Sequence, residues 1–302
     1  MQIKLSENFR AVFYAPFYAT LALGLFKKQG LDIQLQDSPS PGSGIADMEK
    51  GLIDVVWGGP LRVIKQRDTQ VTSPNDLVAF CEVAAKDPFF LVAPPQTNAF
   101  ELAHLRHLKL GTVSEVPTPW LCLQQDLRDA GIDPMVLARG PERSMPENLS
   151  ALARGELDVV QLFEPFVSQA VAQGVGQVVH AAHARGWTAY TTFIATQASI
   201  DKHREAFEAM VLAIEQFSPW LQAHGTDELA KVVQPFYPDL PHSILASAMA
   251  RYASAQLWSC QRAVSRAGFA RLGLSMQSSG FVRHVAPYED CIAPWAQETA
   301  GL

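Results

Sequence analysis

The stretch GLIDVVWGGP (residues 51–60) has a close counterpart later in the chain, GELDVVQLFEP (residues 155–165). Each copy contains a glycine, an aliphatic residue, the run Asp-Val-Val and a short turn that ends in proline. A helix-like segment precedes the glycine in both copies, so we interpret Gly51 and Gly155 as left-handed residues that end those helices. The Val-Val pairs are typical of a buried strand. Because the same unit occurs twice, the sequence predicts two lobes of related construction.

The two copies differ after the Val-Val pair, where the chain leaves each strand at its carboxyl end and starts another helix near a proline. In open α/β sheets, ligands bind in the crevice outside the carboxyl ends of the strands. We therefore expect two turns to face a ligand, Trp57–Gly59 in one lobe and Leu162–Glu164 in the other. A cleft between two such lobes is a common position for a small-molecule site.

Length and composition limit the classes of protein that fit. The chain has 302 residues, which exceeds one typical core and suits two lobes. Apolar residues make up 48% and charged residues 18%, as in ordinary soluble globular proteins. The formal net charge is -6 without a long basic run, which disfavours nucleic acid as a partner. No apolar run reaches the ~18 residues of a membrane span.

The first residues and the cysteines bear on the cellular compartment. Residues 1–5 are typical of a first strand and lack the basic start and apolar core of a secretion signal. We expect a periplasmic protein if a signal has been removed ahead of residue 1, and a cytoplasmic protein otherwise. The four cysteines, Cys81, Cys122, Cys260 and Cys291, have no metal-ligand spacing, so we predict buried thiols, no metal and no cofactor. A disulfide between Cys260 and Cys291 stays open for an exported protein.

The order of the other segments predicts an α/β fold. Strand-like segments alternate with helix-like segments of ~10 residues through the first part of the chain, which indicates βαβ units. The predicted strands are 3–5, 31–35, 53–57, 109–113, 135–138, 157–161 and 175–180. Beyond residue 200 the predicted elements are helices, at 201–223, 227–234, 242–260 and 263–272.

The segment APFYATLALGLFKKQGLDI (residues 15–33) carries a resemblance to a known family. Its pattern is Ala-Pro followed by Gly-x-Phe-x-x-x-Gly-Leu-Asp and then Ile or Val. The motif Gly51-x-x-Asp54 and the segment 151–165 fit the same family. Over most of its length, residues 1–260, the chain resembles proteins of the type II periplasmic-binding-protein fold. The resemblance is to the NMT1/THI5-like (SsuA-like) group, typified by alkanesulfonate-, nitrate- and thiamine-pyrimidine-precursor-binding proteins.

This resemblance implies a two-lobe clamp. Each lobe would be a mixed, mostly parallel sheet flanked by helices, with the ligand cleft between the lobes. The first lobe would take residues 1–95 and 191–302, and the second lobe residues 96–190. Segments 89–95 and 191–196 would be the hinge strands, and the lobes would close on a ligand that contacts both of them.

The resemblance also implies a substrate-binding component of an ABC importer, a monomer with a small organic ligand and an ABC permease as partners. The alternatives are a ligand sensor or a cytoplasmic enzyme on the same fold, with thiamine-pyrimidine-related, desulfinase-like or decarboxylase-like chemistry. The desulfinases carry a cysteine after the first strand, whereas the first cysteine here is Cys81. The cysteine cluster of the yeast-type pyrimidine synthase is absent, as are Ser-His-Asp, GxSxG and P-loop patterns. We therefore predict no catalytic residue and favour a binding protein over an enzyme.

The loop after the first strand supplies the first candidate ligand contacts. In the family that the chain resembles, this loop faces the ligand. We predict that Phe13 or Tyr14 stacks on the ligand and that Arg10 meets an anionic group. The alternative is that the aromatic rings pack under the first helix and that Arg10 is solvated.

Five further candidates, Trp57, Gly58, Gly59, Asp87 and Tyr190, lie near the ends of first-lobe strands. Trp57 offers a large flat face beside the exposed backbone of Gly58 and Gly59, although it would equally serve as core filler. Asp87 is a candidate partner for a ligand amine, or a residue that caps a turn. Tyr190, just before the returning strand, is a weaker candidate.

The second lobe supplies the opposing candidates. Thr118 and Trp120 open a helix whose start would face the cleft, although an N-cap role for Thr118 is structurally sufficient. Phe163 and Glu164 follow the second Val-Val pair, and Glu164 either binds an amino-bearing ligand or favours a helix dipole. Because most candidates are aromatic and their few charges are mixed, we expect a small flat ligand. It would be pyrimidine-like or another heteroaromatic compound, or an organic sulfonate or carboxylate, rather than a bare inorganic anion.

Overall fold

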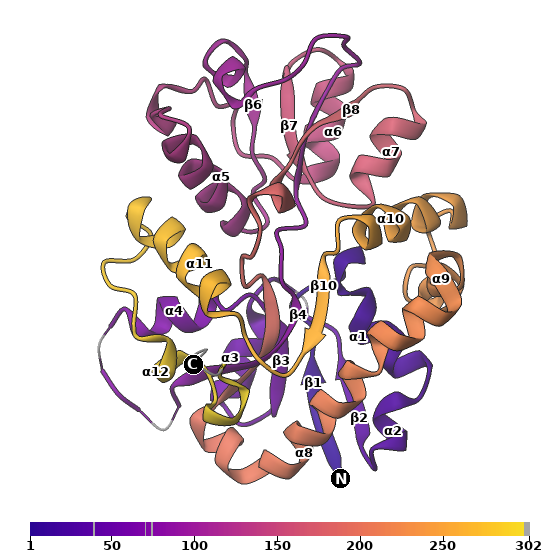
Figure 1. The fold of residues 1–302 in the computed structure, drawn as a ribbon, viewed down its shortest axis with the longest axis vertical. Coiled ribbons are helices and arrows are strands. Elements are labelled where there is room, and N and C mark those ends of the chain that lie inside the picture. Colours follow the sequence, from indigo (N-terminus) through magenta and orange to yellow (C-terminus); the bar gives the residue numbers. More distant parts are fainter. Residues whose placement is uncertain (39, 70, 74, 299–302) are drawn as a thin grey trace.

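The computed structural model describes residues 1–38, 40–69, 71–73 and 75–298. Figure 1 shows two lobes, each built around its own sheet with helices packed outside it. The amino-terminal end of the chain lies in the lower lobe of this view, and the chain passes to the upper lobe and returns. The two-lobe α/β fold that the sequence predicts is therefore confirmed.

The first lobe contains, among the described residues, a six-stranded sheet in the order β10-β4-β9-β3-β1-β2. Its strands are β1 (Gln2–Ser6), β2 (Asp32–Gln36), β3 (Val55–Gly58), β4 (Leu77–Ala84), β9 (Thr191–Thr196) and β10 (Trp258–Gln261). β1 is parallel to β2 and to β3, whereas β9 is antiparallel to both of its neighbours. β10 is also antiparallel to its neighbour β4, so the sheet is mixed.

Helices and short 3-10 turns cover the first sheet. The α-helices are α1 (Ala15–Ala22), α2 (Leu25–Lys28), α3 (Ser43–Glu49), α4 (Leu61–Arg67), α8 (Gln197–Glu215), α9 (Phe217–Val233), α10 (His242–Ser254), α11 (Arg266–Ser278) and α12 (Tyr288–Cys291). The 3-10 turns are η1 (Val12–Tyr14), η5 (Gln234–Phe236) and η6 (Pro294–Ala296). Of these elements, η1, α3 and α4 contribute residues to the site described below.

The second lobe contains, in the described part of the chain, a four-stranded sheet in the order β6-β7-β5-β8. Its strands are β5 (Phe90–Ala93), β6 (Leu110–Gly111), β7 (Val159–Leu162) and β8 (Gln177–Ala181). Its helices and turns are η2 (Leu102–His107), α5 (Thr118–Asp129), η3 (Pro134–Val136), α6 (Met145–Ala153) and α7 (Phe166–Ala172). The turn η4 (Ala182–Arg185) begins the segment that returns to the first lobe. β6 and β7 are parallel, and β5 is antiparallel to β7 and β8.

The duplicated phrase forms the same unit in both lobes. The Asp54 carboxylate accepts a hydrogen bond of 2.8 Å from the amide of Lys4 in β1. The Asp158 carboxylate accepts one of 2.7 Å from the amide of Lys109, just ahead of β6. The glycine three residues before each aspartate has a φ of 73° or 70°, the left-handed conformation that glycine adopts cheaply. Each copy therefore ends a helix, turns, and fastens its strand to the start of a parallel neighbour.

The boundary between the lobes falls earlier than the sequence suggests. The sequence places residues 1–95 in the first lobe, but β5 pairs with β7 and β8 of the second sheet. The chain therefore crosses to the second lobe through residues 85–89 and returns through residues 182–190. Residues 299–302, assigned to the first lobe from the sequence, lie outside the described residues.

Two secondary-structure predictions are wrong. Residues 135–136, predicted as the start of a strand, lie in η3, because the Asp133 side chain accepts a hydrogen bond of 2.9 Å from the Met135 amide and stabilises a turn. Residues 258–260, predicted as the end of a helix, lie in β10, which completes the sheet beside β4. Pairing with an existing sheet edge outweighs local helix propensity there.

The structure also bears on the disulfide left open by the sequence, a membrane-spanning helix and a metal site. All four cysteines are buried and unpaired, so Cys260 and Cys291 do not form a disulfide in the structure. Across the described residues, no helix combines the length and the apolar character that crossing a membrane requires. The described residues also contain no group of three or more His, Cys, Asp or Glu side chains placed to hold a metal ion.

Candidate ligand-binding site

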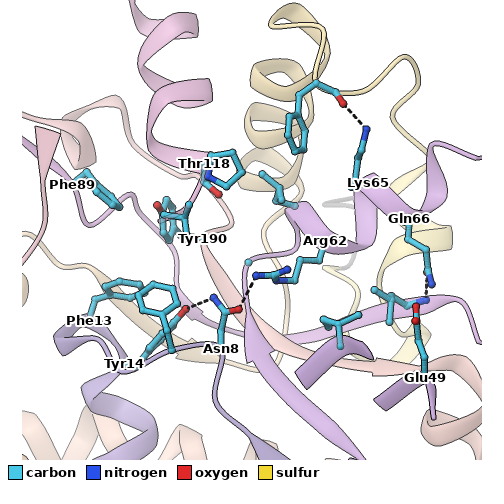
Figure 2. A pocket seen from close by; sticks show the side chains of 18 residues that line it. Asn8, Phe13, Tyr14, Glu49, Arg62, Lys65, Gln66, Phe89, Thr118 and Tyr190 are labelled. Atoms are coloured by element: carbon cyan, nitrogen blue, oxygen red, sulfur yellow. Dashed lines mark hydrogen bonds between the residues drawn. The ribbon is translucent and has the colours of Figure 1, made fainter. Parts of the chain in front are cut away.

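A cavity with a volume of about 380 Å³ lies where the two lobes meet (Figure 2). The first lobe contributes the loop after β1, together with residues of α3 and α4. The second lobe contributes residues 116–118 at the start of α5, and the crossing segments contribute Phe89 and Tyr190. The cavity is therefore lined from both lobes and from the connections between them.

One wall of the cavity is aromatic. Phe9, Phe13, Tyr14, Phe89 and Tyr190 all line it. The rings of Phe13 and Tyr14 have centroids 4.2 Å apart, and Phe13 meets Tyr190 edge to face at 6.1 Å. The short turn η1 produces this cluster because it presents Phe13 and Tyr14 immediately before α1 begins. Such a wall suits a flat apolar group on a ligand.

Arg62, on α4, extends toward the middle of the cavity, as Figure 2 shows. Its Nη2 atom donates a hydrogen bond of 2.7 Å to the Asn8 side-chain oxygen, which also accepts one of 3.1 Å from the Gly42 amide. In the described part of the chain, no carboxylate forms an ion pair with Arg62. Burial lowers the pKa of Arg62, with the neighbouring Tyr14 acting in the opposite direction. A partly desolvated cation that lacks a counter-ion favours an anionic ligand.

Two further polar groups point into the same space. Thr118 begins α5, and the first turn of an α-helix leaves amide groups without partners inside the helix. The positive end of the α5 dipole therefore lies across the cavity from the first lobe. The Tyr190 hydroxyl is buried and has no hydrogen-bond partner among the described residues, and burial raises its pKa well above the usual range. It is a neutral phenol that is ready to donate to a ligand.

Five residues predicted from the sequence line this cavity. They are Phe13, Tyr14, Gly59, Thr118 and Tyr190. At Gly59, an added Cβ would lie 3.2 Å from the carbonyl oxygen of Tyr190, so the glycine permits the two segments to pass closely. The structure therefore brings together candidates from the first lobe, the second lobe and a crossing segment.

Three other candidates lie outside the cavity lining. Trp57 is fully buried and stacks on Phe17 with ring centroids 4.5 Å apart, which is the core role left open by the sequence. Gly58 pairs with Thr192 of β9, within the sheet. Trp120 packs against the second-lobe core, and its ring lies 4.3 Å from the Arg139 guanidinium carbon.

The two acidic candidates, Asp87 and Glu164, form ion pairs with arginines of the same chain. Asp87 forms an ion pair of 2.6 Å with Arg185 and also accepts a hydrogen bond of 2.9 Å from the Phe89 amide. Glu164 forms an ion pair of 2.7 Å with Arg251. Both carboxylates have no solvent exposure, so neither is placed to receive a ligand amine.

Arg10 and Phe163 lie at a second cavity between the lobes, with a volume of about 670 Å³. Phe9 lines both cavities. Arg10 is ion-paired with Glu7 at 2.9 Å and with Asp37 at 2.7 Å, so its charge is already balanced. Phe163 packs edge to face on Phe13, with ring centroids 5.4 Å apart. These two candidates therefore flank the aromatic wall of the first cavity.

Sequence reasoning missed five polar lining residues, which are Asn8, Glu49, Arg62, Lys65 and Gln66. Arg62 and Lys65 are three residues apart and follow Pro60, where the duplicated phrase starts a new helix. Lys65 lies near the rim and donates a hydrogen bond of 2.8 Å to the Phe281 carbonyl oxygen. The sequence signal for Arg62 and Lys65 was a pair of basic side chains on the helix that follows a turn predicted to face the ligand.

The fold and the cavity define the class of the protein, which has the two-lobe periplasmic-binding-protein fold. The structure resembles the periplasmic aliphatic sulphonate binding protein SsuA from Escherichia coli, with a TM-score of 0.78 and 14% identity over 97% of each chain. It also resembles the ligand-binding component of an ABC-type import system from Staphylococcus aureus. There the TM-score is 0.71 and the identity 13%, over 100% of this chain and 99% of that one. At these identities the likeness concerns the fold alone.

The chain belongs to the NMT1-like family, which it matches over residues 9–234. A relative in this comparison is YtlA from Bacillus subtilis (strain 168), described as a candidate binding protein. It is 22% identical over 298 residues, which cover 96% of this chain and 87% of that protein. The family predicted from residues 15–33 and the duplicated phrase is therefore confirmed.

Proposed function

We propose that this protein is the substrate-binding component of an ABC-type importer and closes its lobes on a small organic anion that carries a flat ring. The main support for this proposal is the environment of Arg62. Its guanidinium lines an interlobe cavity, is partly desolvated, and is oriented by Asn8 rather than neutralised by a carboxylate. A bound carboxylate or sulfonate would supply the missing charge through charge-assisted hydrogen bonds.

The rest of the lining supports a ring beside that anionic group. Phe13 and Tyr14, which belong to the aromatic wall, lie on the side of the cavity opposite Thr118 at the start of α5 in Figure 2. A cavity of about 380 Å³ is within the range of small-ligand sites. The positive end of the α5 dipole and the Tyr190 hydroxyl are complementary to anionic or hydrogen-bond-accepting atoms. A bare inorganic anion would leave the aromatic wall uncovered.

The proposal includes the cellular setting that this role requires. The Escherichia coli and Staphylococcus aureus proteins whose fold it shares are described as a periplasmic binding protein and as a component of an ABC-type import system. By analogy, we propose that this protein works as a monomer in the periplasm and delivers its ligand to an ABC permease. An enzyme on this fold has less support, because no cysteine or histidine lines the cavity in the described part of the chain.

A thermal-shift panel tests the proposed ligand class. The panel contains aromatic carboxylates, aromatic sulfonates, neutral pyrimidines and aromatic amines, each added to the wild-type protein. A ligand at a hundredfold excess over its dissociation constant stabilises the native state by ~2.7 kcal/mol. We expect the ring-bearing anions to raise the melting temperature and the amines to leave it unchanged. A response to amines alone would contradict the anion assignment, and no response from any compound would contradict the binding function.

A further inference from the structure

The lobes also meet away from the cavity, along the helices α5 and α11. Figure 1 shows α11 of the first lobe running beside α5 of the second. Arg271, on α11, bridges two carboxylates of α5, with N–O distances of 2.8 Å to Asp126 and 2.5 Å to Asp129. Further along, the Ser278 hydroxyl donates a hydrogen bond of 2.6 Å to the Gln125 side-chain oxygen. Polar contacts therefore fasten the second lobe to the first on this flank.

The charges continue inward to the connections between the lobes. Asp126 also receives hydrogen bonds from Arg185, whose Nε atom lies 2.8 Å from Oδ1. Arg185 in turn forms an ion pair of 2.6 Å with Asp87. Asp87 lies in one crossing segment and Arg185 in the other. Acidic and basic side chains thus alternate in one continuous ion-pair network that runs from the connections between the lobes to α11. Its members, in order, are Asp87, Arg185, Asp126, Arg271 and Asp129.

The ion-pair network has a buried part near the connections between the lobes and a more exposed part between α5 and α11. The side chains of Asp87, Arg185 and Asp126 are 0%, 6% and 8% exposed, whereas those of Arg271 and Asp129 are 21% and 47% exposed. Separation of the lobes would break the bonds of Arg271 and leave Asp126 paired with Arg185. No buried charge would be left without a partner, so the step avoids the large penalty of an isolated buried ion.

The start of α11 fixes the direction of such a movement. At Gly268, an added Cβ would lie 2.8 Å from the backbone nitrogen of Ala189, in the returning connection. The first turn of α11 therefore packs closely against the returning connection, and we expect the gap between α11 and α5 to widen toward Ser278. Arg271 lies one turn beyond that contact, where a small rotation already separates it from its carboxylates.

We propose that Arg271 is an affinity-determining residue that acts through lobe closure and never touches the ligand. It bridges α11 to α5 only when the lobes are together, so it raises the population of the closed state. This inference rests on the proposed binding function, because a ligand held by both lobes binds the closed state. The apparent dissociation constant is the intrinsic constant divided by the closed fraction. Loss of the bridge would therefore weaken binding without any change in the cavity.

The test measures lobe separation in the absence of any ligand. Spin labels are attached through Leu52→Cys and Met135→Cys, at positions 54% and 81% exposed in the first and second lobes. The native cysteines are buried, which limits labelling to the introduced sites. Pulsed electron paramagnetic resonance then gives the distribution of distances between the labels, in 50 mM and in 1 M sodium chloride.

We expect Arg271→Gln to raise the ratio of open to closed molecules about fivefold to tenfold, as loss of a charge-assisted double contact would. High salt should shift the wild-type protein in the same direction and leave Arg271→Gln unchanged, because salt screens exposed ion pairs. The matched control is Arg266→Gln, also on α11, whose partner Glu289 belongs to the same lobe at 2.6 Å. Arg271→Lys, which keeps one charge but not the double bridge, should give an intermediate distribution.

The same distance distribution for Arg271→Gln and the wild-type protein would overturn the proposal. An equal shift with Arg266→Gln would overturn it as well, because the effect would then belong to α11 stability. Circular dichroism on each variant establishes that the chain is folded. Since no ligand is used, a failure here leaves the ligand assignment standing, and a failed ligand panel leaves this test valid.

Discussion

The Nη2 atom of Arg62 donates a hydrogen bond of 2.7 Å to the side-chain oxygen of Asn8, and this contact orients the guanidinium toward the interlobe cavity. Asn8 is neutral, so it positions the cation without neutralising it. The Asn8 amide in turn donates to the Tyr14 hydroxyl at 3.5 Å, which connects the charge to the aromatic wall. The guanidinium that we propose to bind an anion is therefore connected to the aromatic wall through a single side chain.

Arg62→Gln should remove most of the affinity for a ring-bearing anion. Hydrogen bonds to charged groups contribute about 1.5–3 kcal/mol, so the dissociation constant for the best aromatic anion of the panel should rise about tenfold to a hundredfold. Isothermal titration calorimetry measures this change. Arg10→Gln is the control, because Arg10 is paired with Glu7 and Asp37 and does not line the cavity. Equal losses in both variants would argue for a long-range charge effect rather than a contact with Arg62.

Tyr190→Phe should separate binding from folding. The Tyr190 hydroxyl is buried without a partner in the described structure, so its removal should leave the free energy of unfolding unchanged or slightly higher. Binding of the same anion should weaken about threefold to tenfold if the hydroxyl donates to it. Denaturant titration and calorimetry on one preparation give both quantities. A clear loss of stability with unchanged affinity would instead make Tyr190 a structural residue.

Asp54→Ala and Asp158→Ala test the equivalence of the duplicated units. Each change removes one hydrogen bond to the backbone of a parallel neighbour, at 2.8 Å and 2.7 Å respectively. We expect each variant to lose about 1 kcal/mol of unfolding free energy, and the double variant to lose the sum, since the sites are in different lobes. Guanidinium chloride unfolding measures the three values. Strong non-additivity would show that the units do not act independently.

Glu82 should make the protein less stable as the pH rises. It lies in β4 with no solvent exposure, and burial raises its pKa from 4.5 to about 8, against a weaker opposing effect of the Ser265 amide. Between these values the folded state keeps a proton that the unfolded state loses, so the free energy of unfolding falls as the pH increases. At about 1.4 kcal/mol per pKa unit, the loss from pH 4.5 to pH 7 is about 3 kcal/mol.

Glu82→Gln should flatten that dependence, because the amide does not ionise. Urea unfolding at a series of pH values between 4.5 and 9 compares the slopes of the variant and the wild-type protein. Both proteins should differ least at the acidic end and most at pH 8 and above. Parallel curves would mean that Glu82 does not titrate in this range.

The sequence was sufficient for the architecture because the relevant signals are local. A glycine after a helix, an aspartate at a strand entrance and a Val-Val pair predict their unit from neighbouring residues alone. The short turn η1 is also local, which is why Phe13 and Tyr14 were identified as candidates. The lobe boundary was harder to predict. Residues 90–93 have a strand-like sequence, but that sequence does not specify which of the two sheets the strand joins.

The site was only partly predictable because its charges depend on distant partners. Arg62 meets Asn8 from a position 54 residues away, and β1–β3 pairing brings them together. Asp87 and Glu164 looked available, but each is paired with an arginine nearly a hundred residues further along the chain. Trp57 lies next to a ligand-facing turn, yet alternation along β3 directs its ring into the core against Phe17.

The most direct measurement of the central claim compares a ring-bearing anion with its neutral isostere. Benzoate, benzenesulfonate and benzamide are titrated into the wild-type protein by calorimetry under identical conditions. The proposed function predicts that at least one anion binds, and that benzamide binds at least about tenfold more weakly because it cannot pair with Arg62. Binding of benzamide as tightly as the anions, or of the amide alone, would contradict it.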